Sequence, residues 1–165
     1  MSTMRATPRR LTPAAACWLL VAWVALAAAP PATVADEPSF RHVDIDRYIE
    51  RMKPRKQGTR ELFRPVPVTF DASVKQHPHP RKVQYLYTVL DIFPLEPRPQ
   101  VNHRMFVTTP GGRIIPVYVE DGLVERIRAR LREDGQRTQF NAYHVYTYSK
   151  GPALLVVGFE GGDRQ

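Results

Sequence analysis

Apolar and polar side chains alternate from Val66 to Val74, where every second residue is apolar. Successive side chains of a strand point to opposite faces, so this pattern predicts a strand with one buried face. Two further strands are predicted near the C-terminus, at residues 139–148 and in the apolar run at residues 153–159. The segment between them, Ser149-Lys150-Gly151-Pro152, is typical of a turn.

The middle of the chain is less regular. The run at residues 83–93 (VQYLYTVLDIF) is apolar on both faces and rich in β-branched and aromatic residues, which favours a long, curved central strand. Before it, residues 76–81 (QHPHPR) are expected to form a loop stiffened by Pro78 and Pro80. After it, prolines at positions 94, 97 and 99 indicate a long loop.

A hairpin is expected next. Residues 105–107 and 114–119 flank a Pro110-Gly111-Gly112 turn signal, so the two segments are predicted to pair. Pro116 lies inside the second segment, which implies an edge strand or a bulge because proline lacks an N–H donor.

Two helices are predicted from apolar residues at helical spacing. The first covers residues 44–52, ends at Pro54 and has Ile45, Tyr48, Ile49 and Met52 on one face. The second follows the hairpin, with Asp121 as the expected N-cap and Gly135 as the C-terminal stop. Its expected buried residues are Leu123, Val124, Ile127 and Leu131.

The order of strands, with one helix between the third and the fourth, resembles the OB-fold superfamily over residues 65–160. Its supporting features are the alternation at residues 66–74, the strand and helix in IIPVYVEDGLVERIRARL, and the closing strands in YHVYTYSKGPALLVVGF. The resemblance implies a mainly β fold: a five-stranded Greek-key barrel with one capping helix, preceded here by the short N-terminal helix. Another small α+β barrel or roll is the alternative.

The N-terminus has the features of a secretory signal peptide. Arg5, Arg9 and Arg10 precede a 16-residue apolar run at positions 14–29, and small residues follow it. We expect cleavage near Ala35 and export to the periplasm or the medium; an uncleaved anchor is the alternative. The expected organisation is a signal peptide (1–35), a helix with a basic linker (36–64), a barrel (65–160) and a tail (161–165).

The cysteine count and the net charge limit the kinds of site that the chain can form. Cys17 is the only cysteine, so residues 36–165 have no disulfide, thiolate nucleophile, thiolate metal site or thioether-linked haem. These residues hold 21 basic and 16 acidic side chains, a net charge of +5. Such moderate basicity permits an acidic partner without requiring one.

The resemblance also implies a binding face on strands two and three, with rims from the loops after strands one and four. Nucleic-acid binding on such a face uses flat aromatic rings to stack on bases and cations to hold phosphates, and both residue types are present. The alternative is that the tyrosines only pack the barrel. The candidate residues are Tyr85, Tyr87, Arg104, Arg113, Tyr146 and Lys150.

The expected partner is a protein, peptide or glycan of the cell envelope, with no cofactor. Nucleic acid is less favoured because an exported protein meets little of it. The basic linker at residues 53–64 is a candidate for peripheral contact with an anionic membrane.

Metal binding and catalysis are the weaker alternatives. His77 and His79 are weak metal candidates, because alternate residues of an extended segment point in opposite directions. His144 could serve a haem or metal carrier, and a calcium-dependent nuclease of barrel type would need carboxylates such as Asp71, Asp91, Glu120 and Asp121. No catalytic motif is recognisable, so the sequence predicts a non-catalytic binding or accessory protein.

Overall fold

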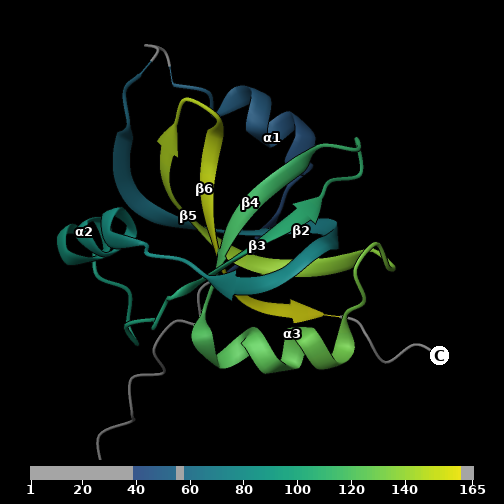
Figure 1. The fold of residues 1–165 in the computed structure, drawn as a ribbon. Coiled ribbons are helices and arrows are strands. Elements are labelled where there is room, and N and C mark those ends of the chain that lie inside the picture. The colour runs from purple at the N-terminus through teal and green to yellow at the C-terminus, as the bar shows by residue number, and fades with distance from the viewer. Residues whose placement is uncertain (1–38, 55–57, 161–165) are drawn as a thin grey trace, which may run out of the picture. The chain divides into compact units, whose positions relative to one another are not determined.

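Five strands close on themselves in the computed structural model, which describes residues 39–54 and 58–160 (Figure 1). The strand order is β2-β3-β4-β6-β5, and β5 returns to pair with β2. All neighbours are antiparallel except β4 and β6, which are parallel. The strands are β2 (Glu61–Pro80), β3 (His103–Thr108), β4 (Ile114–Val119), β5 (Thr138–Tyr148) and β6 (Gly151–Glu160).

The mainly β, five-stranded Greek-key barrel expected from the sequence is therefore present. The contact between β4 and β6 is short, with Tyr118 paired to Leu155 and Val119 to Val156. Pro116 precedes this contact, where β4 pairs only with β3, so its missing N–H costs no hydrogen bond to β6. A two-residue strand, β1 (Arg41–His42), adds a parallel edge to β2.

The expected N-terminal helix is confirmed as α1 (Ile45–Arg51), which begins where the Asp44 side chain accepts a hydrogen bond from the backbone N–H of Arg47. The expected helix between strands is a 3₁₀ turn, η1 (Asp121–Leu123), followed by α3 (Val124–Arg130). Figure 1 shows α3 across one end of the barrel and α1 near the opposite end. The four apolar residues predicted for the inner face of the second helix are all buried: Leu123, Val124, Ile127 and Leu131.

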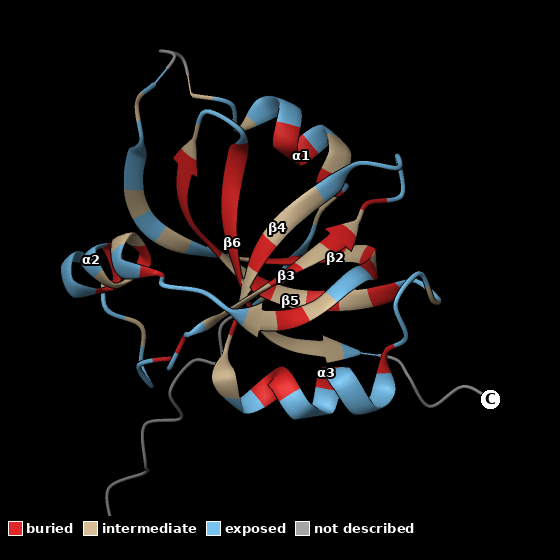
Figure 2. Ribbon diagram, viewed as in Figure 1, coloured by how far each residue is buried: buried red, intermediate tan, exposed pale blue. Residues whose placement is uncertain are grey.

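The main core fills the barrel. Phe70 on β2 and Phe140 on β5 are register partners, both completely buried, with ring centroids 5.8 Å apart. Ile45 and Ile49 of α1 and Ile127 of α3 join the same cluster. Figure 2 shows the buried residues on the sides of α1 and α3 that face the strands. The two helices thus close the apolar interior.

The segment predicted as a central strand at residues 83–93 is a helix, α2 (Gln84–Ile92). It buries Leu86, Val89 and Leu90 against the outer side of the barrel, where Val145 and Leu155 belong to the same cluster. These three residues have helical spacing, and so do the exposed polar residues of the run, Gln84, Thr88 and Asp91, whereas the prediction relied on its β-branched and aromatic content. The prediction was wrong for that reason.

The loop predicted at residues 76–81 is also wrong, because residues 76–80 continue β2 and pair with β3. The pairing of β2 with β5 ends at Ala72, so this part of the strand has one unpaired side that tolerates Pro78 and Pro80. At its other end β2 begins at Glu61, four residues before the predicted barrel boundary at residue 65.

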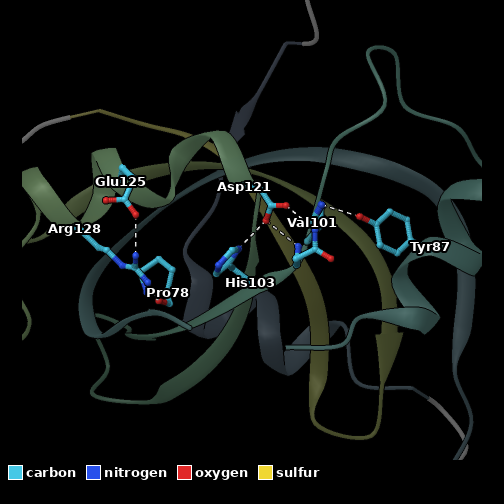
Figure 3. A network of polar contacts seen from close by, with 8 residues as sticks. Pro78, Tyr87, Val101, His103, Asp121, Glu125 and Arg128 are labelled. Carbon is cyan, nitrogen blue, oxygen red and sulfur yellow. Dashed lines mark hydrogen bonds and ion pairs between the residues drawn. The ribbon is translucent and has the colours of Figure 1, made fainter. Parts of the chain in front are cut away.

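Asp121 does not cap the helix as predicted. Its carboxylate accepts hydrogen bonds from the backbone N–H and the side-chain amide of Asn102, at 2.8 and 2.7 Å, and lies 2.7 Å from His103 Nδ1 (Figure 3). These contacts hold the start of β3 to η1. The Arg128 guanidinium likewise donates to the carbonyl of Pro78 and joins α3 to β2. The helix ends at Arg130, before the predicted stop at Gly135.

Several predicted features lie outside the described residues: the signal peptide at 1–35, the first residues of the segment that follows it, part of the basic linker and the C-terminal tail. In the described ranges, no helix has the length and apolar character that a membrane crossing requires.

One side chain of α1 holds the β3–β4 hairpin, and its removal gives a testable effect. Asp46 accepts hydrogen bonds from the Thr109 hydroxyl and the Gly111 backbone N–H, each at 2.7 Å. We expect Asp46→Ala to lower the free energy of unfolding by about 2 kcal/mol, because it leaves both donors without this carboxylate. Asp91→Ala, which removes an exposed carboxylate paired with Arg98, should change it by about 0.5 kcal/mol. Urea denaturation compares them, and equal effects would contradict the role of Asp46.

Candidate functional site

Aromatic and basic side chains gather on the outer surface of the barrel. On β3 and β4 they occupy the positions that alternate with buried Met105, Val107, Val117 and Val119, so they point away from the core. Neighbouring side chains from β2 and β5 extend the surface. We call it the aromatic–arginine face and define it as His79, Arg104, Phe106, Tyr118, Tyr146 and Tyr148.

The side chains of this face contact one another. The His79 ring stacks on Phe106 with centroids 5.9 Å apart and an interplanar angle of 13°. The guanidinium carbon of Arg104 lies 4.9 Å from the Phe106 ring centroid. The hydroxyls of Tyr118 and Tyr146 are hydrogen-bonded at 2.7 Å. These contacts fix the orientation of the rings.

A groove of about 180 Å³ runs beside these rings. Arg60 and Arg104 both line it, together with Tyr118, Tyr146 and Tyr148, and no acidic side chain of residues 39–54 or 58–160 lines it. The guanidinium of Arg60 lies 4.0 Å above the ring of Tyr85, whose edge meets Tyr146 at a centroid distance of 4.9 Å. The groove therefore presents two cations among aromatic rings.

The polar atoms of the groove favour an anion. Burial raises the pKa of Tyr146, and its hydrogen bond with the Tyr118 hydroxyl raises it further. Burial also raises the pKa of Tyr148, an effect that nearby Arg104 partly opposes. Both hydroxyls therefore stay neutral at physiological pH. Buried Arg104 Nε has no hydrogen-bond partner within residues 39–54 and 58–160.

Of the six predicted binding residues, Arg104 and Tyr146 line this groove, and Tyr85 lies behind it in contact with Arg60 and Tyr146. Tyr87 does not: its hydroxyl accepts a hydrogen bond from the Val101 backbone N–H, which fixes the segment before β3 (Figure 3). Arg113 pairs with Glu50 of α1, and Lys150 is exposed in the β5–β6 turn.

Arg60, Phe106, Tyr118 and Tyr148 were missed by the sequence analysis. Phe106 and Tyr118 could have been found, because both alternate with apolar residues in the hairpin that was correctly predicted. Arg60 could not, since it was assigned to a linker and its contact with Tyr85 depends on α2.

A second hollow, of about 670 Å³, lies between α1, β1 and the first half of β2. We call it the α1–β2 cleft. Its apolar lining includes Val43, Met52, Phe63, Val66 and Val68, with Tyr48 and His144 also in the lining. The sequence did not predict it, because these residues are brought together only by the fold.

His144 lies in the lining of this cleft and is 1% exposed. The Tyr48 hydroxyl donates to its Nδ1 at 2.8 Å, and its Nε2 lies 3.0 Å from the Thr147 hydroxyl and 3.1 Å from the Tyr146 carbonyl. Burial lowers the pKa of His144 to about 4. The imidazole is therefore neutral at pH 7 with both nitrogens hydrogen-bonded, which leaves neither free for a haem iron or another metal.

The other candidate ligands are dispersed. His77 Nε2 lies 2.7 Å from the Leu131 carbonyl, whereas His79 stacks on Phe106, so the pair does not share a site. Asp71 pairs with His42, and Asp91 pairs with Arg98. Within the described residues, no group of three or more histidines, cysteines or carboxylates is placed to hold a metal ion.

The basic segment at residues 53–64 also divides among different environments. Lys53 pairs with Glu50 at 2.6 Å, Arg60 stacks on Tyr85, and Arg64 lines the α1–β2 cleft. Arg55 and Lys56 lie outside the described residues. The three described cations therefore serve different parts of the surface.

A scan against protein-family models, a search of curated proteins and a search of solved structures each found no match.

Proposed function

We propose that this chain is an exported, non-catalytic binding protein of OB type that holds an acidic oligosaccharide on the aromatic–arginine face. The observation that carries the proposal is the groove in which Arg60 and Arg104 lie among tyrosine rings, with no acid from the described part of the chain in its lining. Such a groove favours a ligand that combines negative charge with flat or apolar surfaces.

The position of the face supports this function. It covers the outer side of β3 and β4, which are the second and third strands of the five-stranded barrel. OB-type barrels bind oligosaccharides and oligonucleotides on these strands. The N-terminal segment has the composition of a signal peptide, and export favours a glycan over a nucleic acid.

The chemistry of the face supports binding rather than turnover. Arginine guanidinium groups donate several hydrogen bonds in one plane, which suits carboxylate and sulfate groups. The raised pKa values of Tyr146 and Tyr148 keep their hydroxyls protonated, so they are poor general bases near neutral pH.

The test uses the full chain, expressed with its N-terminal segment and purified in the form that the cell makes. Calorimetric titration with a galacturonate hexamer should show saturable binding that weakens as salt is added, because screening reduces attraction between exposed charges. Arg104→Ala should weaken binding about tenfold, the loss expected for one charge-assisted contact.

Arg113→Ala is the matched control, since it removes the same charge from a residue that pairs with Glu50 away from the groove. It should bind the hexamer as tightly as the wild-type protein. Equal binding of a neutral maltohexaose, tighter binding of an oligothymidylate, or an Arg104→Ala variant that binds normally would each contradict the proposal.

A further inference from the structure

The α1–β2 cleft has the size and lining of a ligand site that is separate from the aromatic–arginine face. Its volume of about 670 Å³ is ample for a small molecule, since ligand pockets commonly span roughly 300–1,000 Å³. Its wall includes Phe63, Met52 and Val66, and Val66 is left 43% exposed. An apolar ligand group that covers this wall removes apolar surface from water, which favours binding.

The imidazole and phenol in the lining already have hydrogen-bond partners. The Tyr48 hydroxyl is hydrogen-bonded to His144 Nδ1, and His144 Nε2 has hydrogen-bond partners on β5. Burial keeps His144 uncharged at neutral pH by lowering its pKa to about 4. These two groups therefore offer neither a charge nor a free nitrogen to a ligand, and they behave as part of the neutral wall.

Basic side chains line the same cleft. Arg41 of β1, Arg51 at the end of α1 and Arg64 of β2 all contribute, and all three are exposed. None of them forms an ion pair with an acid in the described ranges, and the one acid of the lining, Asp44, already pairs with Arg47 at 3.3 Å. The cleft therefore combines an apolar wall with an excess of positive charge.

The neighbouring strand edge argues against an extended peptide as the occupant. Residues 61–62 and 66–67 of β2 pair with β5, with an irregularity between them, and in the described part of the chain no strand pairs with the other side of residues 61–67. Two of these residues, Pro65 and Pro67, have no N–H and interrupt the donors that an added strand needs. A ligand held by its tail and its charge fits the cleft better.

We propose that the α1–β2 cleft binds a single-chain anionic amphiphile, a long-chain carboxylate in its monomeric form. The alkyl chain lies along Phe63, Met52 and Val66, and the carboxylate is held by Arg51 and Arg64. This site does not depend on the proposed function, because it lies on other elements and uses other residues.

Calorimetric titration with dodecanoate below its micelle concentration tests the site, again with the full chain in the form that the cell makes. Dodecanoate should bind saturably, and decanoate about tenfold more weakly, because each methylene removed from a buried chain costs a similar increment. Dodecanol, which has the same chain without the charge, should bind about tenfold more weakly than dodecanoate.

Matched variants locate the ligand. Val66→Asp should weaken dodecanoate binding at least about tenfold, whereas Leu62→Asp, at a position 41% exposed on the same strand but outside the cleft, should leave it within about twofold. Arg51→Ala with Arg64→Ala should lower the affinity about tenfold, and Arg47→Ala on the same helix should not. Far-UV circular dichroism checks that each variant is folded.

Absence of dodecanoate binding would overturn the proposal, as would equal binding of dodecanol or equal losses in Val66→Asp and Leu62→Asp. Binding to anionic phospholipid vesicles without binding of monomeric dodecanoate would also overturn it, in favour of a membrane surface.

Discussion

Replacing Phe140 by alanine should lower the free energy of unfolding by about 4 kcal/mol, the largest effect that we expect from one side chain. Phe140 is completely buried inside the barrel and packs against Phe70, its register partner on β2. Truncation removes apolar area from the core and leaves a cavity between β2 and β5. Urea denaturation measures the loss.

Phe159→Ala is the matched control for this prediction. Phe159 is also on the β5–β6 pair but is only partly buried, with Arg126 5.5 Å from its ring centroid. Its truncation should cost about 1–2 kcal/mol, because less area leaves water when this ring packs. If the two variants lose the same free energy, Phe140 does not occupy a closed interior.

Acid should destabilise the protein through His144. The buried imidazole has a pKa of about 4, against an ordinary value of 6.5, so the folded state binds its proton less readily than the unfolded state. This contribution to stability is complete above pH 6.5 and is lost as the pH falls toward 4. The free energy of unfolding should fall by about 3 kcal/mol over that window.

His144→Gln isolates this effect, because glutamine does not titrate and keeps a donor near Thr147. Carboxylates whose pKa is lowered, such as Glu50 and Asp121, also lose their stabilising effect in acid, and the variant retains them. The difference between wild-type and variant slopes from pH 7 to pH 4 therefore reports His144. Identical slopes would show that another group controls the acid response.

The sequence predicted the parts of the fold in which apolar residues recur at one clear spacing, every second residue for a strand or every three to four residues for a helix. Val66–Val74 alternates strictly and is a strand, and the apolar residues of α1 and α3 have helical spacing and are buried. The hairpin was predictable because Pro110-Gly111-Gly112 separates two apolar segments. In each case the local pattern and the tertiary environment agree.

The errors occurred where local pattern and tertiary contacts disagree. Residues 83–93 are rich in β-branched and aromatic side chains, which favours a strand. They form a helix that packs on Val145 and Leu155 and leaves its polar residues, Gln84, Thr88 and Asp91, exposed at helical spacing. Pro78 and Pro80 indicated a loop, but β2 tolerates them because one side of the strand is unpaired there.

The candidate site was also predicted where the local sequence pattern sufficed and missed where tertiary contacts decide. The idea of a tyrosine and arginine surface on strands two and three came from the sequence, and Arg104 and Tyr146 belong to it. The second strand was nevertheless misidentified, so Phe106 and Tyr118 were overlooked, and Tyr87 was included although its hydroxyl binds Val101. The α1–β2 cleft depends on contacts between residues far apart in the chain, such as Tyr48 and His144.

Chemical-shift mapping of the isotope-labelled protein with the galacturonate hexamer tests the central claim, that the outer surface of β3 and β4 binds the ligand. We predict that the shifts which change on titration belong to His79, Arg104, Phe106 and Tyr118, while those of Val66 and Phe63 in the α1–β2 cleft stay fixed. Changes confined to other surfaces, or none at saturating hexamer, would contradict the account.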